Sequence, residues 1–283
     1  MKLETITDNH MHIDPANGMG LEAAKRFKRA GGTCMFLVNK MSKDWGVTVA
    51  KAEDFTAVFE GTVELGQMIA EETGLAVFPV VGVHPAELVY LCARFGTVRA
   101  LEISTGAVDI AGGFVESGLA AALGEIGRPH YPVEPDVFEA SNKLLEHALC
   151  VAKDLGCAIQ LHTESASEKL FDDLSKMVKN TGIKPDKIVK HFSGPDTAMV
   201  QKRGIMPSVL SSTENIAAAL KHNTGFLMES DYIDDNRRPG AVMGPKTVPR
   251  VTKKLVETGV LSLEDAARIH CDNIEKTYGL ELP

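Results

Sequence analysis

TITDNHMHID, residues 5–14, is the stretch that decides the fold of this 283-residue chain. It begins as a short β-branched strand and runs directly into His10, Met11 and His12. A doubly wound parallel sheet, which is the main alternative for an α/β chain, usually carries a glycine-rich fingerprint after its first strand. This chain places two histidines there instead, which counts against the doubly wound sheet.

Beyond this strand, short apolar segments alternate with longer helical patterns. Several segments, such as CMFLV at 34–38 and AVFPVVGV at 76–83, are apolar nearly throughout, as expected for strands covered on both faces. Strands are predicted at 5–10, 33–39, 76–83, 119–126, 158–162, 187–191, 205–210 and 225–231. Helices are predicted at 21–30, 54–73, 85–95, 136–155, 164–180, 196–203, 213–222, 247–258 and 262–278. Eight strands alternating with helices predict a single-domain α/β protein, a (β/α)8 TIM barrel over residues 1–283.

Composition and charge limit the class of protein. The chain is 44% hydrophobic and 24% charged, which is ordinary for a globular protein, and its net charge is −8. An acidic chain does not attract nucleic acid by bulk charge, so any phosphate recognition has to be local. It has no apolar run of membrane-spanning length, no signal peptide pattern and no CxxC among its five cysteines. We therefore expect a cytoplasmic protein with reduced thiols and no membrane partner; its oligomeric state stays open.

Polar residues gather where the predicted strands end. His10 and His12 lie two residues apart on a strand, so both imidazoles project from the same face. A lone His-x-His more often bonds locally or faces solvent, although neighbouring imidazoles also suit zinc, iron, nickel or manganese. In a barrel all strand ends meet around one mouth, which favours a metal site here. The other strand ends contribute Glu125, His162, His191 and Asp231.

Two acids have the chemistry for such a site. Glu125 follows LAAALG, a small-residue run expected to be a buried strand, where a carboxylate needs a compensating cation or donor. Its two oxygens could bridge two metals; the alternative is a rim glutamate paired with Arg128. Asp231 ends the run LMESD and is interpreted as a metal ligand or general base, with a helix N-cap as the alternative.

Other polar residues are less decisive. His84 in VGVHP either lines the site or only forms a turn that the following proline fixes. His130, in a loop, is assigned no catalytic role, and Asp234-Asp235 is interpreted as solvated surface.

A basic segment follows the last predicted strand. Residues 236–254 contain six basic residues and no acidic residue. Arg237, Arg238 and Lys246 lie in a loop stiffened by prolines, and they are candidates to bind phosphates beside the mouth; the alternative is a solvated basic loop.

In order, DNHMHID, VGVHP, GEIG, LHTE, KHFSG and LMESD resemble the motifs of the TatD-like metal-dependent hydrolases of the amidohydrolase superfamily, over residues 8–279. The resemblance implies one or two divalent metal ions (Zn, Mn, Mg, Ni or Fe) and hydrolysis of phosphodiesters, often as a deoxyribonuclease. It places one metal on His10, His12, Glu125 and Asp231, and the second on Glu125, His162 and His191. Two departures mark a divergent branch with an altered substrate pocket, namely Arg128-Pro129 after GEIG and Tyr232-Ile233 after the last aspartate.

The resemblance and the residues together favour a hydrolase that cleaves phosphodiesters, in nucleic acid or a small substrate, with a metal-activated hydroxide. Glu125 and Asp231 are the expected catalytic residues, and His84, Arg128, Arg237, Arg238 and Lys246 the expected substrate contacts. One alternative keeps the metals but cleaves a cyclic amide, lactone or phosphotriester. Many such enzymes carry a carbamylated lysine on the fourth strand, where this chain has Glu125. Another is a binding protein with structural metals, which would not need an open mouth with two metal sites.

Overall fold

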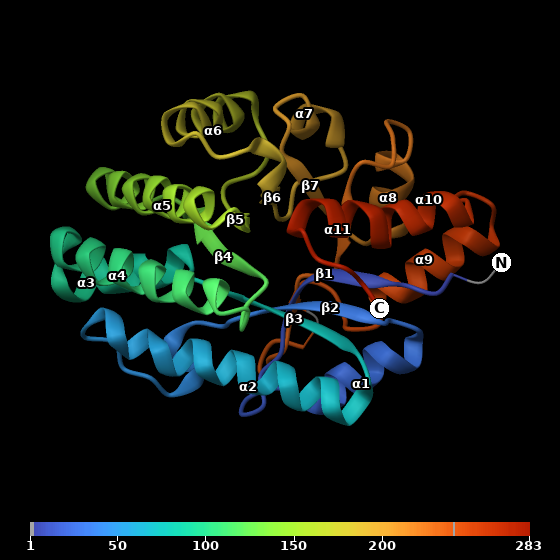
Figure 1. Cartoon of the computed structure of the whole chain (residues 1–283), viewed down its shortest axis with the longest axis horizontal. Helices are drawn as coiled ribbons and strands as arrows, with labels where there is room; N and C mark the ends of the chain where they lie inside the picture. Colours follow the sequence, from blue (N-terminus) through green and yellow to red (C-terminus); the bar gives the residue numbers. More distant parts are fainter. Residues whose placement is uncertain (1–2, 240) are drawn as a thin grey trace.

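The computed structural model describes residues 3–239 and 241–283, and its centre is a sheet of parallel strands (Figure 1). Within these residues the sheet has nine strands, in the order β8-β7-β6-β5-β4-β3-β2-β1-β9. The strands are β1 (Thr7–His12), β2 (Cys34–Val38), β3 (Ala76–Val81), β4 (Ala122–Gly127), β5 (Ala158–His162), β6 (Ile188–Lys190), β7 (Met206–Leu210), β8 (Leu227–Glu229) and β9 (Tyr232–Ile233).

β8 and β9 are two parts of the eighth strand of a barrel. Only Ser230 and Asp231 separate them. β8 pairs with β7, while β9 pairs with β1 through Met11 and Tyr232. The backbone N–H of Ser230 also donates to Asp8 Oδ1 on β1 at 3.0 Å. The sheet therefore closes on itself, and the predicted (β/α)8 barrel is confirmed.

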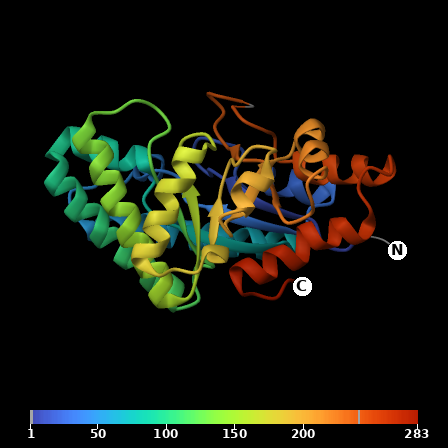
Figure 2. The ribbon, with the colours of Figure 1, turned by 90° about the horizontal axis from the view of Figure 1, so that it is seen from above.

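Helices surround the strands on the outside, as Figures 1 and 2 show from two directions. They are α1 (Leu21–Ala30), α2 (Phe55–Thr73), α3 (Pro85–Phe95), α4 (Thr97–Glu116), α5 (Pro135–Leu155), α6 (Glu168–Thr181), α7 (Thr197–Gln201), α8 (Thr213–Ala219), α9 (Thr247–Glu257), α10 (Leu263–Ala267) and α11 (Asn273–Tyr278). Short 3-10 turns lie at Ser42–Trp45, Ala52–Asp54 and Pro185–Lys187. Every residue of β1, β2 and β4 is buried, because side chains fill the barrel on one face and helices cover the other. None of the helices in the described residues is long and apolar enough to span a membrane.

The structure differs from the prediction at three places. Helix α4 was not predicted, because its sequence holds three glycines and several β-branched residues, which are poor helix formers. A Cβ added at Gly112 would lie 2.9 Å from Val151 on α5, so glycine there permits close helix packing. The last predicted helix is broken by a π-helical turn at Arg268–Asp272, and the eighth strand is interrupted at Asp231.

Candidate metal centre

The carboxyl ends of five barrel strands bring all six predicted ligands together around Glu125. Its Oε1 lies 3.3 Å from His12 Nε2, and its Oε2 lies 3.8 Å from His10 Nε2. The same Oε2 lies 2.8 Å from His162 Nδ1 and 3.8 Å from His191 Nε2. Asp231 Oδ1 completes the group, 3.9 Å from the Nε2 atoms of both His10 and His12.

Hydrogen bonds behind His10 and His12 decide which nitrogen of each ring faces the group. His10 Nδ1 lies 2.7 Å from the side-chain oxygen of Gln160, and His12 Nδ1 lies 3.1 Å from the carbonyl of Val38. Because both partners are acceptors, each Nδ1 carries the proton and each Nε2 presents a lone pair. The two Nε2 atoms are only 3.1 Å apart. Two lone pairs this close, beside two carboxylates, call for a cation between them, so the donor set fits a divalent metal ion.

The charges of the residues around Glu125 also favour a bound cation. Burial alone would lower the pKa of His10, but the adjacent carboxylates of Glu125 and Asp231 raise it to about 10, so the pocket strongly favours a cation, either a proton or a metal ion, on the Nε2 lone pair. Burial raises the pKa of Glu125, yet the surrounding imidazoles outweigh burial and hold it well below its usual range. Glu125 therefore stays ionised in a buried position, where a carboxylate is stable only beside positive charge.

Asp231 lies in an unusual backbone conformation at the break in the eighth strand. Its φ is 47°, in the left-handed region that residues other than glycine seldom adopt. Burial raises its pKa to about 6, against the lowering effect of His10 and His12. A strained, buried aspartate that titrates near neutrality is typical of a functional position.

His84 both forms the turn before Pro85 and lines the site, so the two alternatives for it hold together. Its Nδ1 accepts a hydrogen bond from the backbone N–H of Ala86 at 2.9 Å and so caps helix α3. Its Nε2 lies 3.6 Å from Glu125 Oε1, and its ring lies 4.5 Å from that of His162 between centroids. Burial lowers the pKa of His84 to about 3, so the ring is neutral. Because Nδ1 accepts a hydrogen bond from Ala86, Nε2 carries the proton and faces Glu125 as a donor.

Three groups of side chains in the described residues have ligand atoms within 4.8 Å of one another, as a metal ion requires. The groups are His10–His12–Asp231, His84–Glu125–His162 and His10–His191–Glu229. The first holds three of the four residues expected for one metal. The second joins Glu125 to His162, as expected, but adds His84 where the sequence analysis placed His191.

Several residues that support the ligands from behind are not evident from the sequence. Gln160 donates to the carbonyl of Asn9 (2.9 Å) and to Tyr278 Oη (2.7 Å), and Tyr278 in turn donates to Asn9 Oδ1 (2.7 Å). Asn9 donates to Ser208 Oγ at 3.0 Å. The network then passes from Ser208 to Glu229, whose Oε1 lies 2.9 Å from His191 Nδ1. Gln160, Ser208 and Tyr278 lie in segments that read as apolar strands or as the last helix, so the sequence carries no signal for them; Asn9 directly precedes His10, and Glu229 lies two residues before Asp231.

His130 also lies closer to the site than expected. Its Nδ1 is 2.8 Å from Nε2 of His162, across the loop that follows β4. His162 therefore lies between His130 on one side and Glu125 on the other.

The side chain of Arg128 contacts α5, α6 and the loop after β5, while its backbone N–H donates to the carbonyl of His162 at 2.8 Å. Its buried guanidinium donates to Asn142 Oδ1 at 2.7 Å and to Glu164 at 3.1 Å, and lies 3.6 Å from Asp173. It also lies over the ring of Phe138 on α5. The rim pair between Arg128 and Glu125 does not form; Arg128 instead ties the loop after β4 to α5 and α6.

The basic segment is anchored by Asp235. Arg237 makes a two-pronged contact with this carboxylate, at 2.8 and 3.0 Å, and Arg238 Nε lies 3.5 Å from it. Both guanidinium groups remain largely exposed, and Lys246 is half-buried at the start of α9. The structure brings the two arginines together but places neither in contact with the metal ligands.

The prediction that Asp234 and Asp235 form solvated surface is wrong, since both are buried. Asp234 accepts hydrogen bonds from the backbone N–H groups of Asp14, Met19 and Gly20, and from the hydroxyl of Tyr232. It therefore fastens the loop after β1 to the last barrel strand, beside His12.

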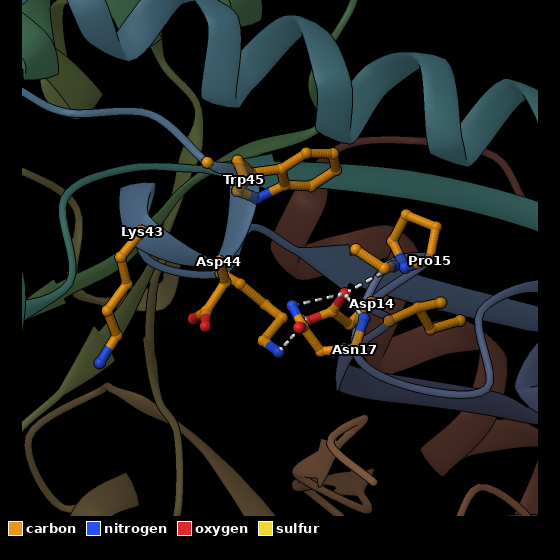
Figure 3. A pocket seen from close by; sticks show the side chains of 10 residues that line it. Asp14, Pro15, Asn17, Lys43, Asp44 and Trp45 are labelled. Carbon is orange, nitrogen blue, oxygen red and sulfur yellow. Dashed lines mark hydrogen bonds and ion pairs between the residues drawn. The ribbon is translucent and has the colours of Figure 1, made fainter. Parts of the chain in front are cut away.

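A cavity of about 390 Å³ lies between this loop and the loop after β2 (Figure 3). Lys40 and Asp14 form a buried ion pair in its wall at 2.5 Å, and Lys40 also donates to the carbonyl of Asp234 at 3.2 Å. The cavity is lined by Ile13, Asp14, Pro15, Ala16, Asn17, Lys40, Lys43, Asp44, Trp45 and Gly46. Ile13 directly follows His12 along the chain, but none of the six predicted ligands lines this cavity.

A (β/α)8 barrel with histidines and carboxylates gathered at the carboxyl ends of its strands defines a class, the metal-dependent hydrolases. The family described as TatD related DNase matches residues 7–279, and the chain belongs to this family. It is 42% identical over 284 residues to an uncharacterized protein of Methanocaldococcus jannaschii, covering 100% of this chain and 98% of that protein.

Solved structures agree with the fold. A TatD-like protein from Archaeoglobus fulgidus superposes with a TM-score of 0.67 at 19% identity, covering 97% of this chain and 100% of the other. A TatD homologue from Escherichia coli K12 superposes with a TM-score of 0.67 at 19% identity, and the match covers 99% of this chain and 100% of the homologue. An L-hydantoinase from Arthrobacter aurescens superposes with a TM-score of 0.57 at 14% identity, and the match covers 98% of this chain and 71% of the hydantoinase. At these identities the likeness concerns the barrel alone.

Proposed function

We propose that this metal-dependent hydrolase cleaves phosphodiester bonds in nucleic acid, most simply as a deoxyribonuclease, with two divalent metal ions. The observation that carries the proposal is the position of Glu125. One of its oxygens faces His12, and the other faces His162. A single carboxylate can thus serve two neighbouring ligand sets, which is the arrangement of two-metal phosphodiester hydrolysis.

The first proposed set is His10, His12, Glu125 and Asp231. The second is Glu125, His162 and His191, and the Nε2–H of His84 faces Glu125 Oε1 beside this set. A divalent ion in these sets would act as a Lewis acid toward phosphate oxygens and lower the pKa of a bound water. Its identity (Zn, Mn, Mg, Ni or Fe) is left to elemental analysis.

The protein's own residues supply orientation and proton transfer. Gln160, Val38 and Glu229 hold three imidazoles so that one nitrogen of each faces the centre. Asp231, beside His10 and His12 at the break in the eighth strand, is the proposed general base that accepts or relays a proton. Arg237, Arg238 and Lys246 are the proposed contacts to phosphates beside the scissile bond.

The class of bond is the part that most needs a test. The purified protein should be assayed on an oligodeoxynucleotide, a small chromogenic phosphodiester, a lactone and a cyclic amide, each with and without added Mn²⁺ or Zn²⁺. We expect metal-dependent cleavage of the two phosphodiesters. Turnover of only the lactone or the amide would replace the proposed function with the other amidohydrolase chemistry. No metal-dependent turnover of any substrate would support a binding protein.

We also propose that the chain acts as one domain in a reducing, cytoplasmic compartment. All five cysteines are unpaired in the structure, and the three buried ones, Cys34, Cys92 and Cys157, lie within the core. Free buried thiols are usual in proteins of reducing compartments.

A further inference from the structure

Five aromatic rings form a continuous row across the second ligand set. Tyr131 and His130 lie 5.2 Å apart between ring centroids, and His130 and His162 lie 5.1 Å apart. The row continues from His162 to His191 at 5.7 Å and from His191 to Phe192 at 5.9 Å. The middle of the row contains proposed metal ligands. The two ends are large aromatic side chains.

Both end residues are exposed in a way that packing does not explain. Phe192 is 47% exposed and Tyr131 is 40% exposed, although each directly follows a histidine of the row. Large aromatic side chains stabilise a fold by being buried, so an exposed pair beside a candidate active site suggests binding.

The backbone of Phe192 adds a second observation. Its φ is 51°, in the left-handed region, where a side chain costs conformational energy that glycine would avoid. The conformation is fixed on both sides. The N–H of Phe192 donates to Glu229 Oε1 at 2.8 Å, and the N–H of Ser193 donates to the carbonyl of Ser208 at 2.9 Å. The fold thus holds an exposed phenyl ring beside His191 at an energetic cost, which is typical of a functional position.

We propose that Phe192 and Tyr131 form a stacking platform for the nucleobases on either side of the phosphodiester held at Glu125. The proposal rests on the function proposed above, because it assumes a nucleic acid substrate. Every base has a flat π-face, so exposed rings bind bases without regard to sequence. In an acidic chain such stacking adds contact with the substrate that does not depend on charge.

A protein-binding patch is the competing explanation for exposed aromatic residues. Such patches are contiguous and apolar. Here the polar rings of His130, His162 and His191 separate Phe192 from Tyr131, so the two exposed rings do not form one apolar surface. A substrate that carries both flat bases and phosphates fits this alternation of exposed aromatic rings and imidazoles better than an apolar partner does.

Binding and hydrolysis of matched probes test the platform. The probes are a labelled oligothymidylate and the same backbone with abasic residues in place of the thymidines. Binding is measured by fluorescence anisotropy in chelator, so that nothing is cleaved, and hydrolysis is measured with the metal-loaded protein. The readout is the preference for the base-bearing probe over the abasic probe.

Phe192→Leu and Tyr131→Leu keep an apolar side chain with the same branching at Cβ, so the backbone conformation is affected little, but they remove the aromatic face. We expect each to reduce the base preference about tenfold. Tyr90→Leu is the matched control, because Tyr90 is 52% exposed on the outer helix α3, and it should keep the preference. A preference that is unchanged in Phe192→Leu and Tyr131→Leu, or equal weakening of both probes, would overturn the platform.

The two proposals fail separately. If base-bearing probes bind with a preference that depends on Phe192 but no phosphodiester is cleaved, the proposed hydrolysis is wrong and the platform stands. If both probes are cleaved and the variants discriminate between them as the unmodified protein does, only the platform is wrong.

Discussion

The side-chain oxygen of Gln160 lies 2.7 Å from Nδ1 of His10, and this contact fixes the tautomer of a proposed metal ligand. The amide nitrogen of Gln160 is already committed to the carbonyl of Asn9 and the hydroxyl of Tyr278. Its oxygen must therefore face His10. His10 Nδ1 then carries the proton, and Nε2 is left free to bind a metal.

Gln160→Leu should consequently weaken metal binding by about 10- to 100-fold, the usual effect of losing a partner behind a metal ligand. It should also cost about 1–3 kcal/mol of unfolding free energy, because buried polar groups lose their partners. Calorimetric titration with Mn²⁺ or Zn²⁺ measures the first effect. Gln160→Glu, which keeps an acceptor for His10, is the control and should lose less affinity. Equal affinity of Gln160→Leu and the unmodified protein would show that His10 needs no such support.

This contact also marks the limit of what the sequence predicted. The histidines and acids at strand ends were found because parallel strands of a barrel carry their carboxyl ends to one face, so order along the chain was sufficient. Gln160 lies inside AIQL, which reads as an apolar strand, and Tyr278 lies in the last helix. Only the packing of α11 beneath the barrel brings them together, and periodicity contains no information about that packing.

The wrong prediction that Asp234 and Asp235 lie on the solvated surface has a similar cause. Two adjacent aspartates after a strand usually face water, and burial of Asp234 depends on three backbone N–H groups more than 200 residues earlier in the chain. Helix α4 was missed for a local reason, since its glycines lower helix propensity while serving close packing against α5.

The bridging role of Glu125 predicts the metal stoichiometry. Glu125→Gln replaces a shared carboxylate with a neutral amide, so one or both sites should lose occupancy. Elemental analysis of the purified variant provides the measurement, with the unmodified protein as the reference at two ions per chain. Retention of the full metal content by Glu125→Gln would remove the bridging role.

Asp231 should matter more to turnover than to folding. Asp231→Asn removes the group proposed to accept the proton, so most activity should disappear. Asparagine tolerates the left-handed conformation found at this position, where φ is 47°, so the thermal midpoint should change by only a few degrees. A large fall in the midpoint with unchanged activity per folded molecule would instead assign Asp231 to a structural role.

The buried pair of Lys40 and Asp14 predicts a pH-dependent contribution to stability. Burial raises the pKa of Asp14, but the hydrogen bonds from Lys40 and Asn17 outweigh it and lower the pKa below its ordinary value of 3.8. The pair therefore stabilises the folded protein fully above pH 3.8, and the stabilisation is lost as the pH falls through the lower folded-state pKa.

Lys40→Met leaves the Asp14 carboxylate buried without its cation and should cost about 3 kcal/mol near pH 7. Urea unfolding in chelator, at pH 7 and below pH 3, measures the difference, which should shrink at the acidic pH because Asp14 is then protonated. Arg99→Met is the matched control, since the Arg99–Glu102 pair is solvent-exposed and should contribute about 0.5 kcal/mol or less. A cost for Lys40→Met that is independent of pH would mean that the lysine stabilises by packing alone.

The last prediction concerns Arg237 and Arg238. Asp235 holds both guanidinium groups from one side, which orders them but leaves their outer edges open to solvent. If these edges bind phosphates beside the scissile bond, replacing both arginines with alanine should raise the KM for an oligonucleotide and flatten its dependence on salt concentration. A small chromogenic phosphodiester has no flanking phosphates, so its hydrolysis should change little.

The control replaces Lys253 and Lys254 on α9 with alanine and removes the same charge, which separates a local phosphate contact from a change in the overall electrostatic field of the protein. Equal effects of the two double variants on the oligonucleotide, or equal loss on both substrates, would exclude a phosphate-binding role for the arginines.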